Sequence, residues 1–233
     1  MLKFGVIAEG KTDQIVIKSI LLGYFQTEEI RIREVQPPPD NTGFTAPHAG
    51  WMLVFDCLKR QEAEKALQFN DYLVIHIDTD MQEEAGFDVP RQKGGKPLSL
   101  PERVEGVIDR LCREIDPDFL KSERKRILFA IAVDSIECWL LPLLFPADKK
   151  KASKVTGCLK TATDQLRKMD QAGLSAGETK YPKAYEQASR EFRKRKELLK
   201  HRSRNPSLEL FIQRLDAIAE QRIAKPADDT QDL

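Results

Sequence analysis

Phe4-Gly5-Val6-Ile7-Ala8 is an apolar, β-branched run that leads directly into Glu9-Gly10-Lys11-Thr12-Asp13. The residues that follow, from Ile15 to Leu21, carry apolar side chains at helical spacing. Together they predict a buried strand that ends at a carboxylate, a tight turn at Gly10 and an amphipathic helix. We expect Thr12 or Asp13 to cap that helix.

A second strand of the same kind also ends in acidic residues. Leu73-Val74-Ile75-His76-Ile77 runs into Asp78-Thr79-Asp80. Because open α/β sheets place their ligand sites at the carboxyl ends of parallel strands, we predict that the two acidic ends form one site. We interpret His76, on the buried strand itself, as a core histidine rather than as a ligand.

Along residues 1–146 the hydrophobic pattern alternates between strands and helices. The strand expected at 30–35 alternates apolar with charged residues and is typical of a sheet edge, whereas the strand at 72–77 is apolar on both faces, like a central parallel strand. This order predicts an α/β fold, a Rossmann-like parallel sheet of about four strands flanked by helices with right-handed crossovers. The strands are expected at 2–8, 30–35, 72–77 and 127–133, and the helices at 13–26, 50–67, 101–114 and 135–146.

The chain changes character after Pro146. We divide it there into an α/β domain (1–146), a helical, basic extension (147–224) and a disordered tail (225–233), with helices expected at 149–170, at 181–199 and from Asn205 onward. Between Lys180 and Arg204, ten lysines and arginines stand against three acids, a net charge of +7. Such a segment either follows a phosphate backbone or forms a solvated charged helix.

The composition excludes several classes of protein. A net charge of +1 gives no global field that would draw the chain to nucleic acid or to a membrane. The most apolar stretch, 127–145, is interrupted by Asp134 and Glu137, which argues against a transmembrane helix. The first apolar run is too short for a secretion signal, so we expect a cytoplasmic protein. The four cysteines form no CxxC pair, and we expect reduced thiols rather than a zinc site.

Residues 5–12 also satisfy the phosphate-binding P-loop pattern G-x-x-x-x-G-K-[ST], in which Lys11 and Thr12 would bind a nucleotide. That loop requires its middle residues to curl around phosphates. Val6 and Ile7 are β-branched and favour an extended strand, and Glu9 would repel a triphosphate. A P-loop nucleotide-binding protein is therefore the weaker alternative.

In the favoured interpretation the first strand runs through Val6 and Ile7 and ends at Glu9. Interpreted in this way, the sequence resembles the Toprim domain of bacterial primases, type II topoisomerases and overcoming-lysogenization-defect (OLD) family nucleases. The motifs of that domain, a glutamate-glycine pair after the first strand and Asp-x-Asp after the third, correspond to Glu9-Gly10 and Asp78-Thr79-Asp80. The stretch Glu9–Asp13, the Trp-Leu-Leu helix within Asp134–Leu141 and, loosely, the helix after Asn205 are most similar to stand-alone bacterial and OLD-type members.

This resemblance implies a metal-dependent nuclease that hydrolyses phosphodiester bonds in DNA or RNA, in a setting of bacterial phage defence. Asp78 and Asp80 would be catalytic residues that bind Mg²⁺ or Mn²⁺, and Glu9 would be a ligand or a general acid or base. Asp13 matches a further acid of OLD-type sites and is either a ligand or only a helix cap. The alternative is a non-catalytic Toprim-like module that binds nucleic acid or a partner such as an ATPase.

Further charged residues extend this predicted site. Carboxylate oxygens suit hard divalent ions, and Glu137, one turn into the helix after the fourth strand, is an additional candidate ligand. We expect Asp134 to cap that helix, with a role as a metal ligand as the alternative. Basic side chains that would contact nucleic acid lie in the first turn, in the long loop at 80–100 and in the basic segment. They are Lys11, which alternatively is a solvated turn residue, and Lys93, Lys96, Arg193, Arg195 and Lys200.

Overall fold

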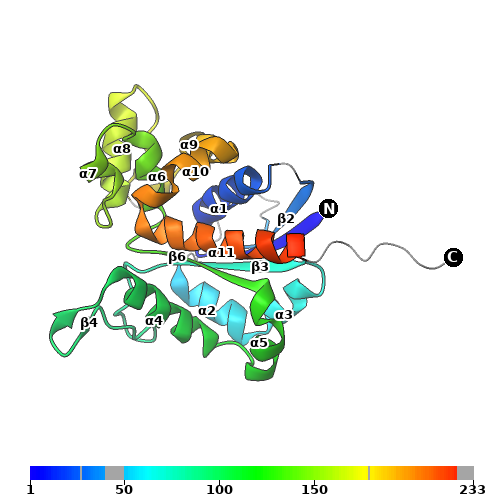
Figure 1. Cartoon of the computed structure of the whole chain (residues 1–233). Helices are drawn as coiled ribbons and strands as arrows, with labels where there is room; N and C mark the ends of the chain where they lie inside the picture. The colour runs from blue at the N-terminus through cyan, green and yellow to red at the C-terminus, as the bar shows by residue number, and fades with distance from the viewer. Residues whose placement is uncertain (27, 40–49, 178, 225–233) are drawn as a thin grey trace.

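Four parallel strands form the central sheet, in the order β2-β1-β3-β6 (Figure 1). The computed structural model describes residues 1–26, 28–39, 50–177 and 179–224, so the tail predicted at 225–233 lies outside the described residues. The predicted α/β fold is confirmed, including the edge position of the strand at 30–35 and the central position of the strand at 72–77. The strands are β1 (Leu2–Ile7), β2 (Ile30–Gln36), β3 (Tyr72–Asp78) and β6 (Ile127–Ala132).

Helices cover both faces of this sheet, because successive strand residues point to opposite sides. Val74 of β3 and Leu128 of β6 face one apolar layer, and their neighbours Ile75 and Phe129 face the other. Figure 1 shows the two helical layers on either side of the sheet. The first layer includes α1 (Lys11–Tyr24), α6 (Glu137–Leu144) and α11 (Pro206–Ala224), and the second includes α2 (Trp51–Lys59), α3 (Glu62–Leu67), α4 (Leu100–Cys112) and α5 (Pro117–Glu123).

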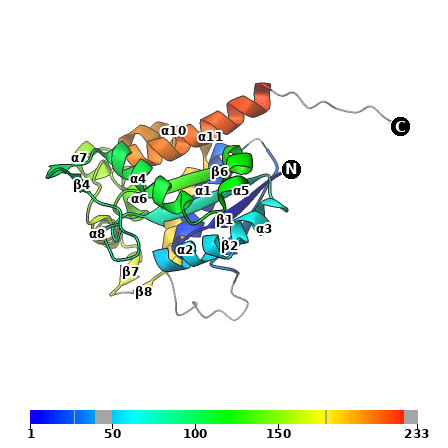
Figure 2. The ribbon, with the colours of Figure 1, turned by 90° about the horizontal axis from the view of Figure 1, so that it is seen from below.

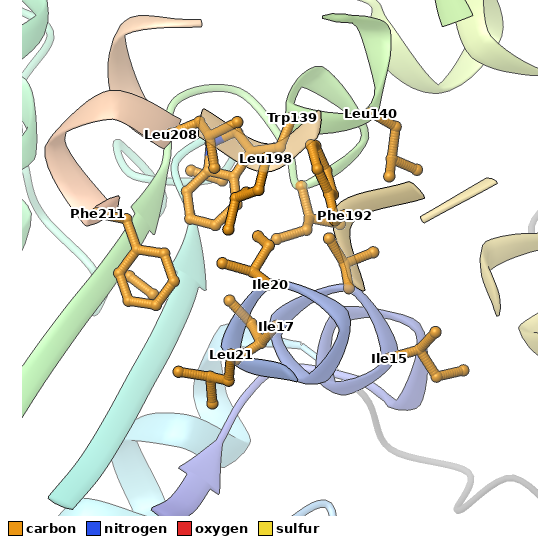
Figure 3. Close-up of a cluster of buried hydrophobic side chains, with 14 of the residues drawn as sticks. Ile15, Ile17, Ile20, Leu21, Trp139, Leu140, Phe192, Leu198, Leu208 and Phe211 are labelled. Carbon is orange, nitrogen blue, oxygen red and sulfur yellow. The ribbon is translucent and has the colours of Figure 1, made fainter. Parts of the chain in front are cut away.

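The first layer joins the C-terminal segment to the rest of the chain. Ile17 and Ile20 of α1 lie in one apolar cluster with Trp139 of α6 and with Phe192 and Phe211 from the end of the chain (Figure 3). The rings of Trp139 and Phe211 are stacked with centroids 5.6 Å apart. The helices after residue 146 therefore share a core with the sheet.

Three helices expected as continuous are broken. Residues 50–67 separate into α2 and α3 at Gln61, whose φ of 59° is left-handed. Residues 149–170 separate into α7 (Lys149–Ala152) and α8 (Cys158–Lys168), with Gly157 also left-handed. Residues 181–199 become α9 (Pro182–Ala188), the 3-10 turn η2 (Arg190–Arg193) and α10 (Arg195–His201).

The third break has a packing cause. A methyl group at Gly23 of α1 would overlap the backbone carbonyl of Phe192 in η2. The chain thus presses its backbone against α1 at a residue without a side chain and buries Phe192 there. A continuous charged helix could not approach α1 so closely, because its side chains would intervene.

Short elements complete the fold. The long loop at 80–100 holds a small hairpin, β4 (Gln92–Lys93) and β5 (Lys96–Pro97), and a second hairpin pairs β7 (Ser175–Ala176) with β8 (Thr179–Lys180). Further 3-10 turns, η1 (Arg124–Arg126) and η3 (Arg202–Arg204), precede β6 and α11. Among the described residues, no helix is both long enough and apolar enough to span a membrane.

Candidate metal centre

The first acidic end lies where β1 passes into α1. Glu9 is half-buried, and its Oε1 accepts a 2.7 Å hydrogen bond from the backbone N–H of Asp78 at the end of β3. Gly10 is the cap of α1, so the prediction of Thr12 or Asp13 as the cap is wrong, because the backbone already turns at the glycine. Asp13 lies in the first turn of α1 and is 3% exposed.

The second acidic end carries a histidine as well as an aspartate. His76 and Asp78 lie two residues apart on β3 and therefore point to the same face. The Nδ1 of His76 lies 2.6 Å from the carbonyl oxygen of Ala130, and because a carbonyl only accepts, this nitrogen carries a proton. Nε2 then faces Asp78, 3.2 Å from Oδ1. Ligand atoms of Asp13, His76 and Asp78 all lie within 4.8 Å of one another, so His76 belongs to the acidic cluster as well as to the core.

Glu137 brings a further buried carboxylate to this face of the sheet. It is the first residue of α6 and is 1% exposed. Its Oε1 accepts hydrogen bonds from the Lys180 ammonium of β8, at 2.8 Å, and from the Tyr185 hydroxyl of α9. The basic segment therefore contributes one lysine directly to the acidic cluster.

A pocket of about 640 Å³ borders the cluster. Asp78, Asp80, Glu137 and Lys180 line it together with residues of α8. The exposed Asp80 is held through its backbone N–H, which donates to the carbonyl oxygen of Asp134 at 3.0 Å. Asp134 also accepts from the Thr79 N–H, so its backbone joins the ends of β3 and β6.

Asp134 does not cap α6 as predicted. The cap is Ile136, two residues later, because Asp134 has a left-handed φ of 67° that turns the chain before the helix starts. Its carboxylate is directed instead toward the start of α8, where the backbone N–H groups of Gly157 and Cys158 lower its pKa against the larger, opposite effect of burial.

Burial and mutual repulsion control the protonation of the cluster. Burial raises the pKa of Asp78 to about 7, with His76 acting in the opposite direction. Burial, followed by the negative charges of Asp78 and Asp13, raises the pKa of Glu9 well above its usual range. Burial would also raise the pKa of Glu137, but the Lys180 ammonium and its hydrogen bonds lower it overall. A bound cation would stabilise the charged forms of Asp78 and Glu9, and would so offset both the cost of their burial and their mutual repulsion.

The donor atoms fit a divalent metal ion. Glu137 Oε2 is buried and has no hydrogen-bond partner among the described residues, and Asp78 Oδ1 has only the 3.2 Å contact with His76 Nε2. Buried polar atoms are nearly always paired, so Glu137 Oε2 is available to a cation, and Asp78 Oδ1 has further capacity to accept one. Oxygen donors are the ligands that Mg²⁺ and Mn²⁺ prefer, and the imidazole Nε2 of His76 suits Mn²⁺ better than Mg²⁺.

A disulfide joins two helices beside this site. Cys138 of α6 and Cys158 at the start of α8 are bonded, so the prediction of reduced thiols is wrong for this pair. Twenty residues separate the two cysteines in sequence, and only the packing of α6 against α8 brings their Cα atoms to 5.0 Å. Cys57 and Cys112 are free thiols, as predicted.

Residues 5–12 do not have the loop geometry that the P-loop interpretation requires. Val6 and Ile7 lie within β1, in extended backbone, rather than in a loop of converging N–H groups. Lys11 forms an ion pair with Glu34 of β2. The ammonium of Lys11 is therefore engaged at the sheet edge and is not among the residues that line the pocket.

The other basic residues predicted to contact nucleic acid are dispersed. Arg193 and Arg195 contact α1, through the Ser19 hydroxyl and the Tyr24 carbonyl, and Lys200 pairs with Glu197. The exposed residues Lys93 and Lys96 lie in the β4–β5 hairpin. In Figures 1 and 2 this hairpin and helix α7 project from the same end of the molecule.

Sequence reasoning placed Lys180 and Tyr185 in a basic segment that could contact nucleic acid, Tyr185 by stacking, but did not place them beside Glu137. Both lie more than 40 positions after Glu137, and Lys180, whose side chain is 35% exposed, is one of many lysines and arginines in that segment. No local pattern marks them. For His76 a signal was present, because its spacing of two from Asp78 puts both on one face of a strand.

Comparison of the chain with protein-family models, with curated proteins and with solved structures found no match.

Proposed function

We propose that this protein is a metal-dependent nuclease that hydrolyses phosphodiester bonds in nucleic acid. The observation that carries the proposal is the convergence of Glu9, Asp13 and Asp78 at the carboxyl ends of β1 and β3, beside an unpartnered carboxylate oxygen and an adjoining pocket. Buried acids that repel one another are unfavourable for stability alone, which supports a role in cation binding.

The chain's own residues divide the work. Asp13 and Asp78 would hold Mg²⁺ or Mn²⁺, with the free oxygen of Glu137 and Asp80, both of which line the pocket, as further ligands. When bound, such an ion polarises a phosphodiester and stabilises the leaving oxygen. His76 holds the Asp78 carboxylate in place through the 3.2 Å contact. Glu9, whose pKa is raised well above the usual glutamate range by burial and by the neighbouring acids, is suited to take up and release a proton.

Lys180 supplies positive charge at the same point. Burial would lower its pKa, but Glu137, Asp13 and Asp78 raise it, so the ammonium stays charged. It lines the pocket and can therefore hold a phosphate oxygen of the substrate next to the carboxylates. The ATPase partner and the phage-defence setting are further parts of this proposal and rest on the Toprim resemblance alone, whereas the cytoplasmic location rests on the short first apolar run.

A cleavage assay tests the proposal. Purified protein is incubated with plasmid DNA, single-stranded DNA and RNA, each with Mg²⁺, Mn²⁺ or EDTA. We expect metal-dependent cutting that falls more than about 100-fold in the double variant Asp78→Asn, Asp80→Asn, because it removes ligand charge from the metal site. Asp109→Asn, on the exposed side of α4, is the matched control and should retain full activity.

Two results would contradict the nuclease. Cutting that persists in the double variant would mean that other residues, or a contaminant, perform the reaction. Metal and nucleic-acid binding without any cutting would favour the non-catalytic module instead.

A further inference from the structure

We propose that the pocket-facing side of α8 binds a backbone phosphate next to the one held at the carboxylates, through Arg167 and Thr163. This inference rests on the proposed function and names how that site would hold a polymeric substrate. It assigns a role to a helix that carries none of the residues predicted to contact nucleic acid.

The pocket is lined by groups of both charges. Its acidic side is formed by the ends of β3 and α6, whereas α8 contributes Lys160, Thr163 and Arg167 together with Asp164, so the charged groups of α8 carry a net charge of +1 there. Lys160, Thr163 and Arg167 recur every three to four positions, so they share one face of the helix. A metal ion on the acidic side and cations on the α8 side would together face consecutive phosphates of one strand.

Thr163 indicates that the pocket-facing side of α8, which we call the α8 wall, is a binding surface. It lines the pocket, it is 6% exposed, and its Oγ1 has no hydrogen-bond partner within the described part of the chain. Its methyl carbon lies against Gly173, so the hydroxyl points elsewhere. A buried hydroxyl without a partner is unfavourable unless a ligand supplies one.

Arg167 is the cation best suited to a phosphate. It is exposed, and its described polar contact is a long one, 3.4 Å from Nη2 to the carbonyl oxygen of Ser175. The guanidinium fork can bind two phosphate oxygens at once. Lys160, by contrast, pairs with Asp164 at 2.8 Å and is 82% exposed, so it contributes less.

The wall is anchored to the acidic cluster. The Cys138–Cys158 disulfide ties the first residue of α8 to the residue that follows Glu137. The backbone N–H groups of Gly157 and Cys158 also face the Asp134 carboxylate. These links hold α8 at a defined distance from the carboxylates, as the binding of two successive phosphates requires.

The test compares Arg167→Ala with Lys168→Ala, the next residue on α8, which is exposed but does not line the pocket. Binding of a labelled single-stranded oligonucleotide is measured by fluorescence anisotropy at several salt concentrations. We expect Arg167→Ala to weaken binding about 5- to 10-fold and to lower the salt slope by about 1, and Lys168→Ala to change neither. Thr163→Val should weaken binding while leaving the melting temperature unchanged or higher, because it removes an unpaired buried hydroxyl.

A small substrate separates this inference from the proposed function. Bis(4-nitrophenyl) phosphate has one phosphodiester and no neighbouring phosphate, so Arg167→Ala should leave its metal-dependent turnover unchanged. Equal losses for the small and the polymeric substrate, or equal oligonucleotide binding by Arg167→Ala and Lys168→Ala, would overturn the role of α8 and leave the nuclease standing. Wild-type protein that binds no nucleic acid would overturn both.

Discussion

Asp78 and Asp216 show two opposite uses of the same side chain. At the metal centre, burial raises the pKa of Asp78 to about 7, and its Oδ1 has only the 3.2 Å contact with His76 among the described residues. Asp216 of α11 accepts hydrogen bonds from the Tyr24 hydroxyl and from Arg202, at 2.7 Å, and these partners lower its pKa although burial alone would raise it.

The difference distinguishes a binding region from a stabilising one. Around Asp216, the charges of α1, η3 and α11 satisfy each other; Arg202 also pairs with Glu209 at 2.8 Å. Around Asp78, five acids share one lysine and one histidine. A cluster that is short of cations reduces the stability of the metal-free fold and reserves its oxygens for a ligand.

The contact that joins the two regions should be the easiest to break. Helix α1 carries Asp13 of the metal centre and Tyr24 of the Asp216 network. Gly23→Ala would add a methyl group to α1 that overlaps the backbone carbonyl of Phe192. We expect a loss of about 3 kcal/mol or more in the free energy of unfolding, measured in urea. Gly106→Ala on α4 is the control: its methyl group meets only Val89, at 3.4 Å, and should raise stability by about 0.5 kcal/mol. Equal effects of the two variants would contradict the close packing at Gly23.

Reducing the disulfide should weaken the metal centre and leave the Asp216 network in place. Cys138 and Cys158 close a loop across 20 positions, so opening it lowers the free energy of unfolding by about 2–3 kcal/mol. Thermal unfolding with and without a reductant measures the change. The double variant Cys138→Ser, Cys158→Ser should match the reduced protein and be insensitive to the reductant; a reductant effect that persists would contradict this assignment.

Asp78→Asn should stabilise the metal-free protein at high pH. The folded-state pKa of Asp78, about 7, lies above its unfolded value of about 3.9, so between these pH values the folded state binds more protons and stability falls as pH rises. Removing the charge should add on the order of 2 kcal/mol at pH 8 and almost nothing at pH 4. Urea unfolding of the wild type and the variant in EDTA, between pH 4 and pH 8, measures this difference in stability. Destabilisation at pH 8 would mean that His76 compensates the buried charge fully.

Asp216→Asn should show the opposite sign and the smallest effect. The pKa of Asp216 is lowered, so its contribution is present above the unfolded pKa of about 3.9 and is lost as pH falls through the folded value. Because the side chain is one-third exposed, we expect a loss of only about 1 kcal/mol at pH 7. Metal binding, followed by calorimetry, should be unchanged in this variant, and a weakened metal affinity would argue against treating the two regions as separate.

Much of the fold was predictable because it depends on local pattern. The alternation of apolar runs marked all four strands of the sheet and their order along the chain, and the charged alternation at 30–35 marked the edge. The helix predictions were wrong where tertiary packing overrides the periodicity of the sequence. Residues 181–199 have a charged helical pattern, but the contact of Phe192 with Gly23 breaks the helix, and no neighbouring residue signals that contact.

For the site, the sequence alone determined which acids meet. Glu9 and Asp78 follow β1 and β3, and strand polarity places the carboxyl ends of parallel strands at one edge. Only the tertiary structure decided what surrounds them: Lys180 and Tyr185 on Glu137, the Cys138–Cys158 bond, and the α8 wall. The reason is physical. The faces of a strand can be read from a few consecutive residues, because side chains alternate with period two and the chain order gives the strand's direction. The pairings around the acids instead join positions 20 to 48 residues apart and depend on how whole helices pack.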